Sequence, residues 1–338
     1  MKKFLSIMLA LVLVLSMSTV AFAADNQNAS FTKTYKITNE GTSNPAETFT
    51  FTFTADHVTD SNKNLTTSDM PAIANATVAY DAGTATTTGL QKSVDVALST
   101  VTWPGVGVYY YKVAETAGTT AGVTYDTASA WLKVTVAYDD NTNTYYTAFV
   151  TLSLDDKNPE DGITDVKTGG FTNEYSAGSL AISKNVTGNM GDKTDAYFAV
   201  KVKLTGESGK TYATSYNVTG GSYQSNPTTI VIGTETTFYL KHNETITISN
   251  LPYGVTYTVV EDDYTTEANG AYDEASYSFS DNNKKIDSAS DSVTITNNKG
   301  TVVDTGIAVD SMPYFLLLAV ACVGLFLFFS KKRMMREN

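Results

Sequence analysis

Residues 48–54 have the sequence Thr-Phe-Thr-Phe-Thr-Phe-Thr, in which aromatic side chains alternate with small polar ones. Successive side chains of a β-strand point to opposite faces, so this alternation predicts a strand with one buried and one exposed face. The same two-residue period recurs in short segments at residues 109–113, 131–136 and 198–204, and turn signals such as Gly220-Gly221 separate such segments. We therefore expect an all-β protein built from immunoglobulin-like β-sandwiches.

A weak internal repeat divides the chain in two. Each half has a lysine in its opening strand, a phenylalanine in the next apolar strand and an asparagine in its last strand. In that order the residues are Lys33, Phe49 and Asn173 in the first half and Lys184, Phe198 and Asn297 in the second. We expect two tandem domains, residues 24–175 and 176–299, with the same kind of fold.

Composition argues against several classes of function. The 338 residues carry a formal net charge of −12 and include two histidines and one cysteine. These counts argue against a His/Cys metal site or a disulfide framework, and an acidic chain without a basic block is a poor nucleic-acid binder. No motif gives His57 or His242 a serine or cysteine partner, so a hydrolase triad is not supported. We expect no metal, no cofactor and no nucleic-acid partner.

The N-terminus has the pattern of an export signal. Lys2 and Lys3 precede an apolar run over residues 4–17, and Ala21-Phe22-Ala23 follows it. A basic start, an apolar run and small residues at the cleavage site predict a signal peptide, residues 1–23. The alternative, an N-terminal membrane anchor, requires a longer apolar span.

The C-terminal segment, residues 300–338, has the pattern of an anchor. Residues 313–329 are almost purely apolar and predict a transmembrane span, and a basic tail at residues 331–336 follows, which the positive-inside rule places in the cytoplasm. Val302-Val303-Asp304-Thr305-Gly306 lies just upstream. A Thr-Gly pair, a spacer, an apolar span and a basic tail together resemble a sortase cell-wall sorting signal, in which proline usually stands at the position of Val303. The alternative is a plain single-span membrane protein.

Six polar residues fall on predicted buried faces. Lys33, for example, alternates with Phe31 and Tyr35. The full set is Lys33, Glu115 and Asn173 in the first half and Lys184, Glu261 and Asn297 in the second. Burying such groups without partners costs several kcal/mol each, so the three members of each set should meet.

Two kinds of contact would satisfy each set. The simpler one is a buried lysine–glutamate ion pair with a hydrogen-bonded asparagine. The other is a covalent lysine–asparagine isopeptide bond. Burial lowers the pKa of a lysine and raises that of a glutamate. A neutral amine beside an amide carbonyl is a competent nucleophile, and a protonated glutamate can polarise that carbonyl and relay protons as ammonia leaves.

The Lys…Glu…Asn placement resembles the isopeptide-linked domains of Gram-positive sortase-assembled shaft pilins, in particular the streptococcal two-domain major pilin. Residues 105–109, 171–173 and 184–189 and the sorting region share the resemblance. It implies a Lys33–Asn173 bond assisted by Glu115 and a Lys184–Asn297 bond assisted by Glu261. The only chemistry implied is this self-modification, and therefore no enzymatic turnover.

The resemblance also implies how subunits are joined. A pilus sortase would cleave between Thr305 and Gly306 and transfer the Thr305 carboxyl group to a lysine of another subunit. Lys167 is the acceptor by its position before Asn173, and Lys157 is the alternative. The partners implied are copies of the same chain, the sortase, minor tip and base pilins and cell-wall peptidoglycan, at the bacterial surface. A monomeric wall-anchored adhesin and a membrane-retained receptor remain as alternative functions.

Overall fold

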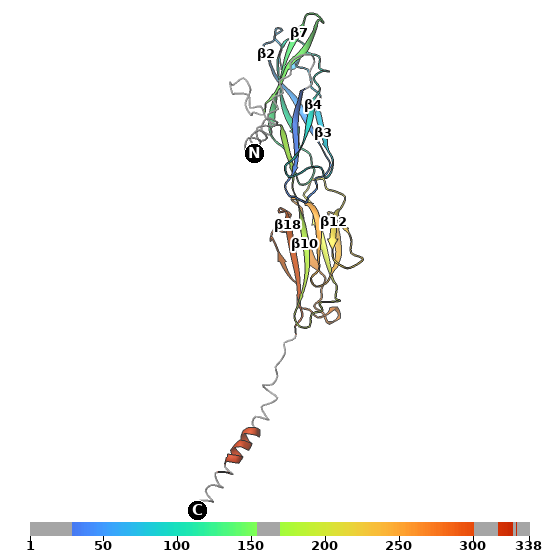
Figure 1. The fold of residues 1–338 in the computed structure, drawn as a ribbon, viewed down its shortest axis with the longest axis vertical. Coiled ribbons are helices and arrows are strands. Elements are labelled where there is room, and N and C mark those ends of the chain that lie inside the picture. The colour runs from blue at the N-terminus through green and yellow to red at the C-terminus, as the bar shows by residue number, and fades with distance from the viewer. Residues whose placement is uncertain (1–28, 154–169, 301–316, 327–328, 330–338) are drawn as a thin grey trace, which may run out of the picture.

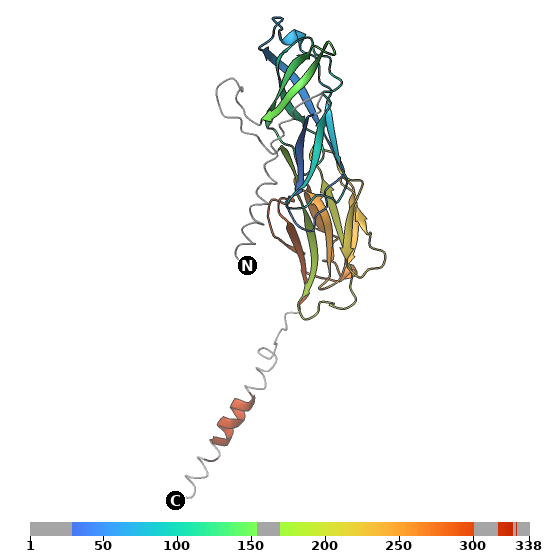
Figure 2. The ribbon, with the colours of Figure 1, turned by 45° about the horizontal axis from the view of Figure 1, so that its top comes forward.

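A computed structural model describes residues 29–153, 170–300, 317–326 and 329. Within the first two ranges the regular secondary structure is almost entirely β-strand, arranged as two lobes that lie end to end (Figure 1, Figure 2). The strands of the first lobe are β1 (Ala29–Ile37), β2 (Glu47–Thr59), β3 (Ala76–Tyr80), β4 (Leu90–Val96), β5 (Gly107–Thr116), β6 (Val123–Thr124), β7 (Ser129–Asp139), β8 (Thr144–Ser153) and β9 (Phe171–Tyr175). Those of the second are β10 (Ala177–Thr187), β11 (Phe198–Thr205), β12 (Tyr216–Gly220), β13 (Thr229–Ile230), β14 (Glu235–Leu240), β15 (Thr245–Pro252), β16 (Thr256–Glu261), β17 (Ser276–Phe279) and β18 (Ser290–Asn298). Two single-turn 3₁₀ helices, η1 (Thr67–Asp69) and η3 (Glu267–Asn269), lie in connections.

Each lobe is a sandwich of two sheets. In the first lobe, a sheet of order β4-β1-β9-β6 faces one of order β3-β2-β5-β7-β8. In the second, a sheet of order β13-β12-β15-β10-β18-β17 faces the three-stranded sheet β14-β11-β16. The expected all-β, two-sandwich architecture is confirmed.

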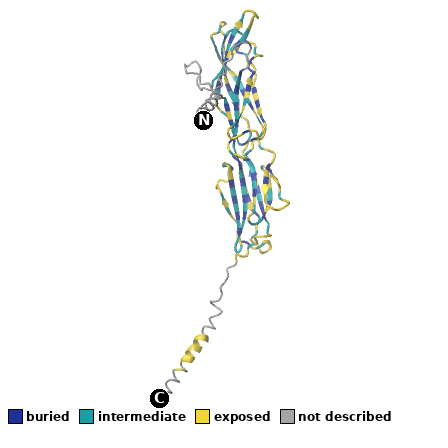
Figure 3. Cartoon of the chain, viewed as in Figure 1, coloured by how far each residue is buried: buried dark blue, intermediate teal, exposed yellow. Residues whose placement is uncertain are grey.

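The alternation in the sequence determines which face of each strand is buried. Every second residue of β1 is buried, from Ala29 to Ile37. In β2, Phe49 and Phe51 are buried, but the pattern weakens at Phe53 and ends where a bulge shifts the pairing with β5. A bulge adds one residue to a strand and so reverses the faces beyond it. The buried residues form stripes along the middle of both sandwiches (Figure 3).

The two sandwiches meet at a short, tightly bonded junction. Ser176 alone separates β9 from β10; its N–H donates to the carbonyl of Gly122 (2.8 Å) and its carbonyl accepts from the N–H of Tyr253 (2.9 Å). The side chain of Asn250 makes two further bonds to the backbone of Ser43, at 2.8 and 2.9 Å. Gly122 has φ +77°, and a Cβ there would lie 2.6 Å from the carbonyl oxygen of Ser176, so the close approach requires glycine.

The predicted terminal segments are only partly described. The signal peptide at residues 1–23 lies outside the described residues. Of the predicted span at residues 313–329, residues 317–326 are helical. No helix in the part of the chain that the structure describes has the length and hydropathy needed to cross a membrane.

Candidate functional site

The lysine and asparagine of each set lie on neighbouring parallel strands. β1 pairs with β9 so that Lys33 is opposite Phe171 and Asn173 is opposite Tyr35. The two functional side chains are thus two positions apart in register and point to the same buried face. β10 and β18 repeat this arrangement, with Lys184 opposite Ile295 and Asn297 opposite Val186.

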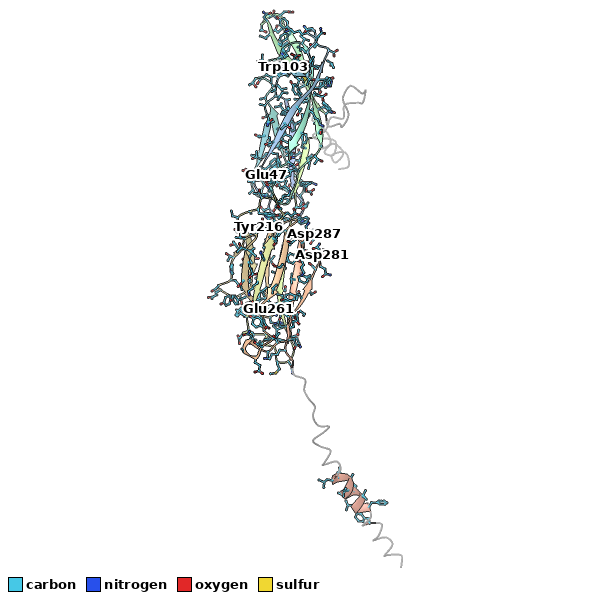
Figure 4. All side chains as sticks on the ribbon, turned by 180° about the vertical axis from the view of Figure 1, so that it is seen from behind. Glu47, Trp103, Tyr216, Glu261, Asp281 and Asp287 are labelled. Atoms are coloured by element: carbon cyan, nitrogen blue, oxygen red, sulfur yellow. The ribbon has the colours of Figure 1, made fainter. Side chains whose placement is uncertain are left out.

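The glutamates come from the facing sheet. Glu115 lies near the end of β5, opposite Phe51 of β2, and Glu261 is the last residue of β16, opposite Val200 of β11. Figure 4 marks Glu261 in the lower part of the second sandwich. Each set therefore bridges the two sheets of one sandwich, and it can form only when both sheets have assembled.

In the first sandwich, the Glu115 carboxylate lies between the other two groups. Lys33 Nζ is 2.6 Å from Glu115 Oε2, and the side chains of both residues are 0% exposed. Asn173 Nδ2 donates a hydrogen bond to Glu115 Oε1. The other end of the Asn173 amide, Oδ1, accepts a hydrogen bond from the backbone N–H of Asp126 at 2.8 Å.

In the second sandwich, the amine and the amide touch directly. Lys184 Nζ is 2.5 Å from Asn297 Oδ1. It also lies 3.2 Å from Glu261 Oε1, an ion pair by distance, although neither carboxylate oxygen has a partner with hydrogen-bond geometry among the described residues. Both the lysine and glutamate side chains are 0% exposed.

Aromatic rings cover both amines. Lys33 Nζ lies 4.6 Å from the ring centroid of Phe49, and Lys184 Nζ lies 4.2 Å from that of Phe198. These phenylalanines are the corresponding residues of the internal repeat. They keep water away from the amines, and a dry environment strengthens every polar contact made there.

Burial shifts the acid–base properties of all four ionisable groups toward their neutral forms. Desolvation lowers the pKa of Lys33 and of Lys184, and the neighbouring glutamate in each case opposes this shift only in part. Desolvation likewise raises the pKa of Glu115 and of Glu261 against the effect of the lysines. Both shifts work toward the neutral forms of the pair, a free amine and a protonated carboxyl group.

This geometry suits nucleophilic attack by an amine on an amide. In the second sandwich the lysine amine lies beside the asparagine carboxamide, and in the first the Glu115 carboxyl group contacts both of the other side chains. A carboxyl group so placed can take a proton from a neutral amine and deliver one to the departing –NH2 group. The Asp126 N–H is placed to stabilise negative charge on Asn173 Oδ1. The six buried polar residues predicted from the sequence meet in two sets of three.

The backbone of Asp126 is a functional group that the sequence did not reveal. Its side chain holds its own loop in place: Oδ2 accepts from the N–H of Thr172 at 2.7 Å and Oδ1 from the N–H of Ala128 at 2.9 Å. A main-chain donor leaves no residue-specific signal. The only trace in the sequence is an aspartate between two strands, a common turn residue.

The remaining predicted site residues are not described. Thr305, Gly306, Lys157 and Lys167 lie outside the described residues. Within the described ranges, no group of three or more His, Cys, Asp or Glu side chains is arranged to hold a metal ion.

Comparisons with known proteins cover both sandwiches. Residues 29–176 match the family described as "Spy0128-like isopeptide containing domain", and residues 178–299 match one described as "Domain of unknown function (DUF7601)". A pilin of Streptococcus pyogenes serotype M1 is 30% identical over 262 residues, which cover 72% of each chain.

Two solved structures of major pilins from Streptococcus pyogenes have the same fold. The T3.2 protein is 25% identical, with a TM-score of 0.55 over 82% of this chain and 99% of its own. A second major pilin is 23% identical, with a TM-score of 0.55 over 82% of this chain and 100% of its own.

Proposed function

The chain belongs to the family of Gram-positive major pilins, and from that premise we propose that it is a pilus shaft subunit held closed by two self-formed isopeptide bonds and joined to its neighbours by a sortase. Its role is structural, as in other members of the family. The proposal concerns two kinds of covalent bond, those within each subunit and those that join one subunit to the next.

The observation that supports the internal bonds is the meeting of Lys, Glu and Asn in each sandwich. In the proposed reaction, Lys33 Nζ attacks Asn173 Cγ and a new C–N bond forms. Glu115 accepts a proton from the amine and returns one to the amide nitrogen, which leaves as ammonia when its C–N bond breaks. Lys184, Asn297 and Glu261 follow the same course. Each carboxyl group ends in its starting state, so no further reactant is needed.

The position of the bonds suits a shaft that bears tension. Lys184 and Asn297 are separated by 113 positions, yet they lie on the strands through which the chain enters and leaves the second sandwich. A bond between them transmits force from the C-terminal end of the sandwich directly to the junction at Ser176. The strands between are bypassed and need not resist unfolding.

Polymerisation is the second part of the proposal. The sortase would join the Thr305 carboxyl group of one subunit to Lys167 of the next, with Lys157 as the alternative acceptor. The sorting pattern upstream of the apolar segment and the membership of the pilin family support this assignment.

Intact mass spectrometry of the chain from Ala24 to Thr305 tests the internal bonds. We expect a mass lower than that of the sequence by two molecules of ammonia, and a deficit of one in Glu115→Ala and in Glu261→Ala. Asp262→Ala, at the residue that follows the end of β16 and has a side chain 44% exposed, is the matched control and should keep both bonds. A wild-type mass equal to that of the sequence would rule out the crosslinks.

The polymer is tested in cell-wall extracts of the native host. High-molecular-weight ladders that disappear in Lys167→Ala and persist in Lys157→Ala would support the assignment. Loss of the ladders only in Lys157→Ala would identify Lys157 as the acceptor lysine. A monomer in every extract would contradict polymerisation and favour a wall-anchored adhesin.

A further inference from the structure

Strand β2 begins with an acidic side chain on its inward face. Residues two positions apart on a strand share a face, so Glu47 lies on the same face as Phe49 and Phe51, which are buried in the core of the first sandwich. Glu47 is half-buried and lies at the end of this sandwich that faces the junction (Figure 4). A carboxylate in this position needs hydrogen-bond donors, and it belongs to neither of the two sets of three.

Two hydroxyl groups supply these donors. Thr120 Oγ1 donates to Glu47 Oε2 at 2.6 Å, and the Tyr125 hydroxyl donates to Glu47 Oε1 at 3.3 Å. The Tyr125 hydroxyl oxygen also accepts from the backbone N–H of Thr120 at 3.3 Å. Burial raises the pKa of Tyr125, so its hydroxyl keeps the proton that it donates. Glu47 therefore ties together the two ends of the segment from Thr120 to Tyr125, which contains β6.

The beginning of this segment is held by the second sandwich as well. The N–H of Ala121 donates to the carbonyl of Thr211 at 2.9 Å, and the N–H of Thr211 donates to the carbonyl of Thr119 at 2.8 Å. The middle of the segment is held by β9, since Val123 of β6 is paired with Tyr175. Beyond β6, the Glu47 carboxylate holds the side chain of the next residue, Tyr125.

Tyr125 matters because the N–H of Asp126 belongs to the peptide group between these two residues. A peptide group is planar, so the direction of this N–H depends on the backbone of both residues. The side chain of Asp126 anchors one side of the peptide group through the two backbone bonds described above. Tyr125 anchors the other side, through Glu47 and through an edge-to-face contact with Phe49 at 6.1 Å between ring centroids.

We propose that Glu47 is a positioning residue for the first isopeptide bond and keeps the Asp126 N–H directed at Asn173 Oδ1. The inference rests on the proposed function, since it concerns the same reaction. Attack of the Lys33 amine on Asn173 Cγ places negative charge on Oδ1, and a donor that is already in place stabilises this charge without reorganisation. Glu47 acts through Tyr125 and the backbone rather than on a reacting atom.

The role of Glu47 is one of position rather than charge. Negative charge has to develop on Asn173 Oδ1, and a second negative charge in the same sandwich opposes this. A neutral side chain that makes hydrogen bonds to the same two hydroxyl groups would therefore serve as well as the carboxylate. Glutamine has the required shape, because its carbonyl oxygen can accept from Thr120 and its amide N–H can donate to the Tyr125 hydroxyl oxygen.

The second site is arranged differently and is an internal reference. There the group that lies 2.5 Å from Asn297 Oδ1 is the Lys184 amine. Glu47 belongs to the other sandwich, so the rate at which the second bond forms should not depend on it.

The rates of the two bonds, measured in one chain, test the inference. The chain from Ala24 to Thr305 is prepared in denaturant, its mass is checked to confirm that no ammonia has been lost, and folding is started by dilution. Peptide masses after quenching and digestion report the two bonds separately. We expect Glu47→Ala to slow the first bond at least about tenfold relative to the second, and Glu47→Gln to restore most of the rate.

Slower bond formation is distinguished from slower folding in the same experiment. Both tryptophans, Trp103 and Trp131, lie in the first sandwich, so their fluorescence reports its folding, and bond formation is timed from the end of that change. Glu174→Ala is the matched control. This glutamate follows Asn173 on β9, but its side chain is 35% exposed and lies 3.4 Å from Lys36 Nζ, so both rates should stay unchanged.

A double substitution distinguishes positioning from a general loosening of the sandwich. Asp126→Ala acts on the same N–H, so Glu47→Ala should slow the first bond much less in an Asp126→Ala background than in the wild type. Effects of the two substitutions that multiply would show that Glu47 acts elsewhere, and they would overturn the inference. Tyr125→Phe keeps the ring against Phe49 and removes only the donor to Glu47; it should also slow the first bond, and it decides the question if Glu47→Ala does not fold.

The outcomes separate this inference from the proposed function. If both bonds form but Glu47→Ala leaves their relative rates unchanged, or if Glu47→Gln is as slow as Glu47→Ala, positioning by Glu47 is wrong while the crosslinks stand. If the wild-type chain loses no ammonia on folding, the proposed function itself fails.

Discussion

Replacing Asn297 by alanine removes the proposed bond in the second sandwich while leaving Lys184 and Glu261 in place. The bond closes a loop of 113 positions. If it restricts the unfolded chain as a disulfide does, closing a loop of this length stabilises the folded state by about 5 kcal/mol. Loss of the Asn297 side-chain hydrogen bond adds about 1 kcal/mol. For a sandwich of this size, each kcal/mol corresponds to about 4 °C, so we expect Tm to fall by about 25 °C.

Differential scanning calorimetry measures this change. The first sandwich keeps its own bond in Asn297→Ala, so its transition is an internal reference. The same substitution made in a Lys184→Met background separates bond from contact, because no bond forms in that background with or without Asn297. There the effect should shrink to about 1 kcal/mol, the ordinary value of one hydrogen bond.

The result that would refute the reasoning is specific. If the wild-type mass shows two ammonia molecules lost but Asn297→Ala lowers Tm by only a few degrees, the bond exists and the loop-closure argument is wrong. Equal effects of Asn297→Ala in the wild-type and Lys184→Met backgrounds would show that contacts alone account for the stability.

Three further predictions concern the reaction itself. Glu115→Gln keeps a hydrogen-bonding group of the same size but cannot relay protons, so the mass should show only the second bond; a deficit of two ammonia molecules would show that the carboxyl group is dispensable. Asp126→Ala loosens the loop whose N–H contacts Asn173 Oδ1, so after refolding from denatured, unlinked chain the first bond should form more slowly than the second; unchanged relative rates would remove that N–H from the mechanism. Burial lowers the pKa of Lys33 and raises that of Glu115, so the pair shares one proton over the pH interval between the two pKa values, and the rate of bond formation should be constant there. The rate should fall at lower pH, where the amine is protonated as well as the acid, and at higher pH, where the acid is lost; a rate that rises steadily with pH would mean that only the amine matters.

The sequence predicts the two sets of three residues because the alternation within a single strand is enough to place each of them on a buried face. Lys33 alternates with buried aromatic residues of β1, and a charged residue at such a position indicates a buried partner wherever that partner lies in the chain. The bulge in β2 after Ala55 gives no comparable signal, because an inserted residue changes the register without changing the composition. The Asp126 N–H is equally hidden, since every residue except proline has one. Side-chain chemistry could thus be predicted, whereas main-chain geometry required the structure.

The position of the two sites follows from how sandwiches are connected. Among the ladders between described strands, β1–β9 and β10–β18 are the two parallel pairs; all others are antiparallel. Neighbouring antiparallel strands can be joined by a hairpin. A covalent bond across a hairpin closes only a short loop, so it adds little to the stability of the folded state. A parallel pair made from the first and last strands of a sandwich has the whole sandwich between its members.

That placement also determines when each bond can form. Lys184 reaches Asn297 only after the last strand has docked beside the first, and Glu261 reaches both only after the facing sheet has closed over them. Before that point the lysine is solvated and protonated, and it is not a nucleophile. The proposed bond would therefore form only after folding of the sandwich is complete. In the proposed polymer, this order of events would ensure that the covalent link through each sandwich is made only in a correctly folded subunit.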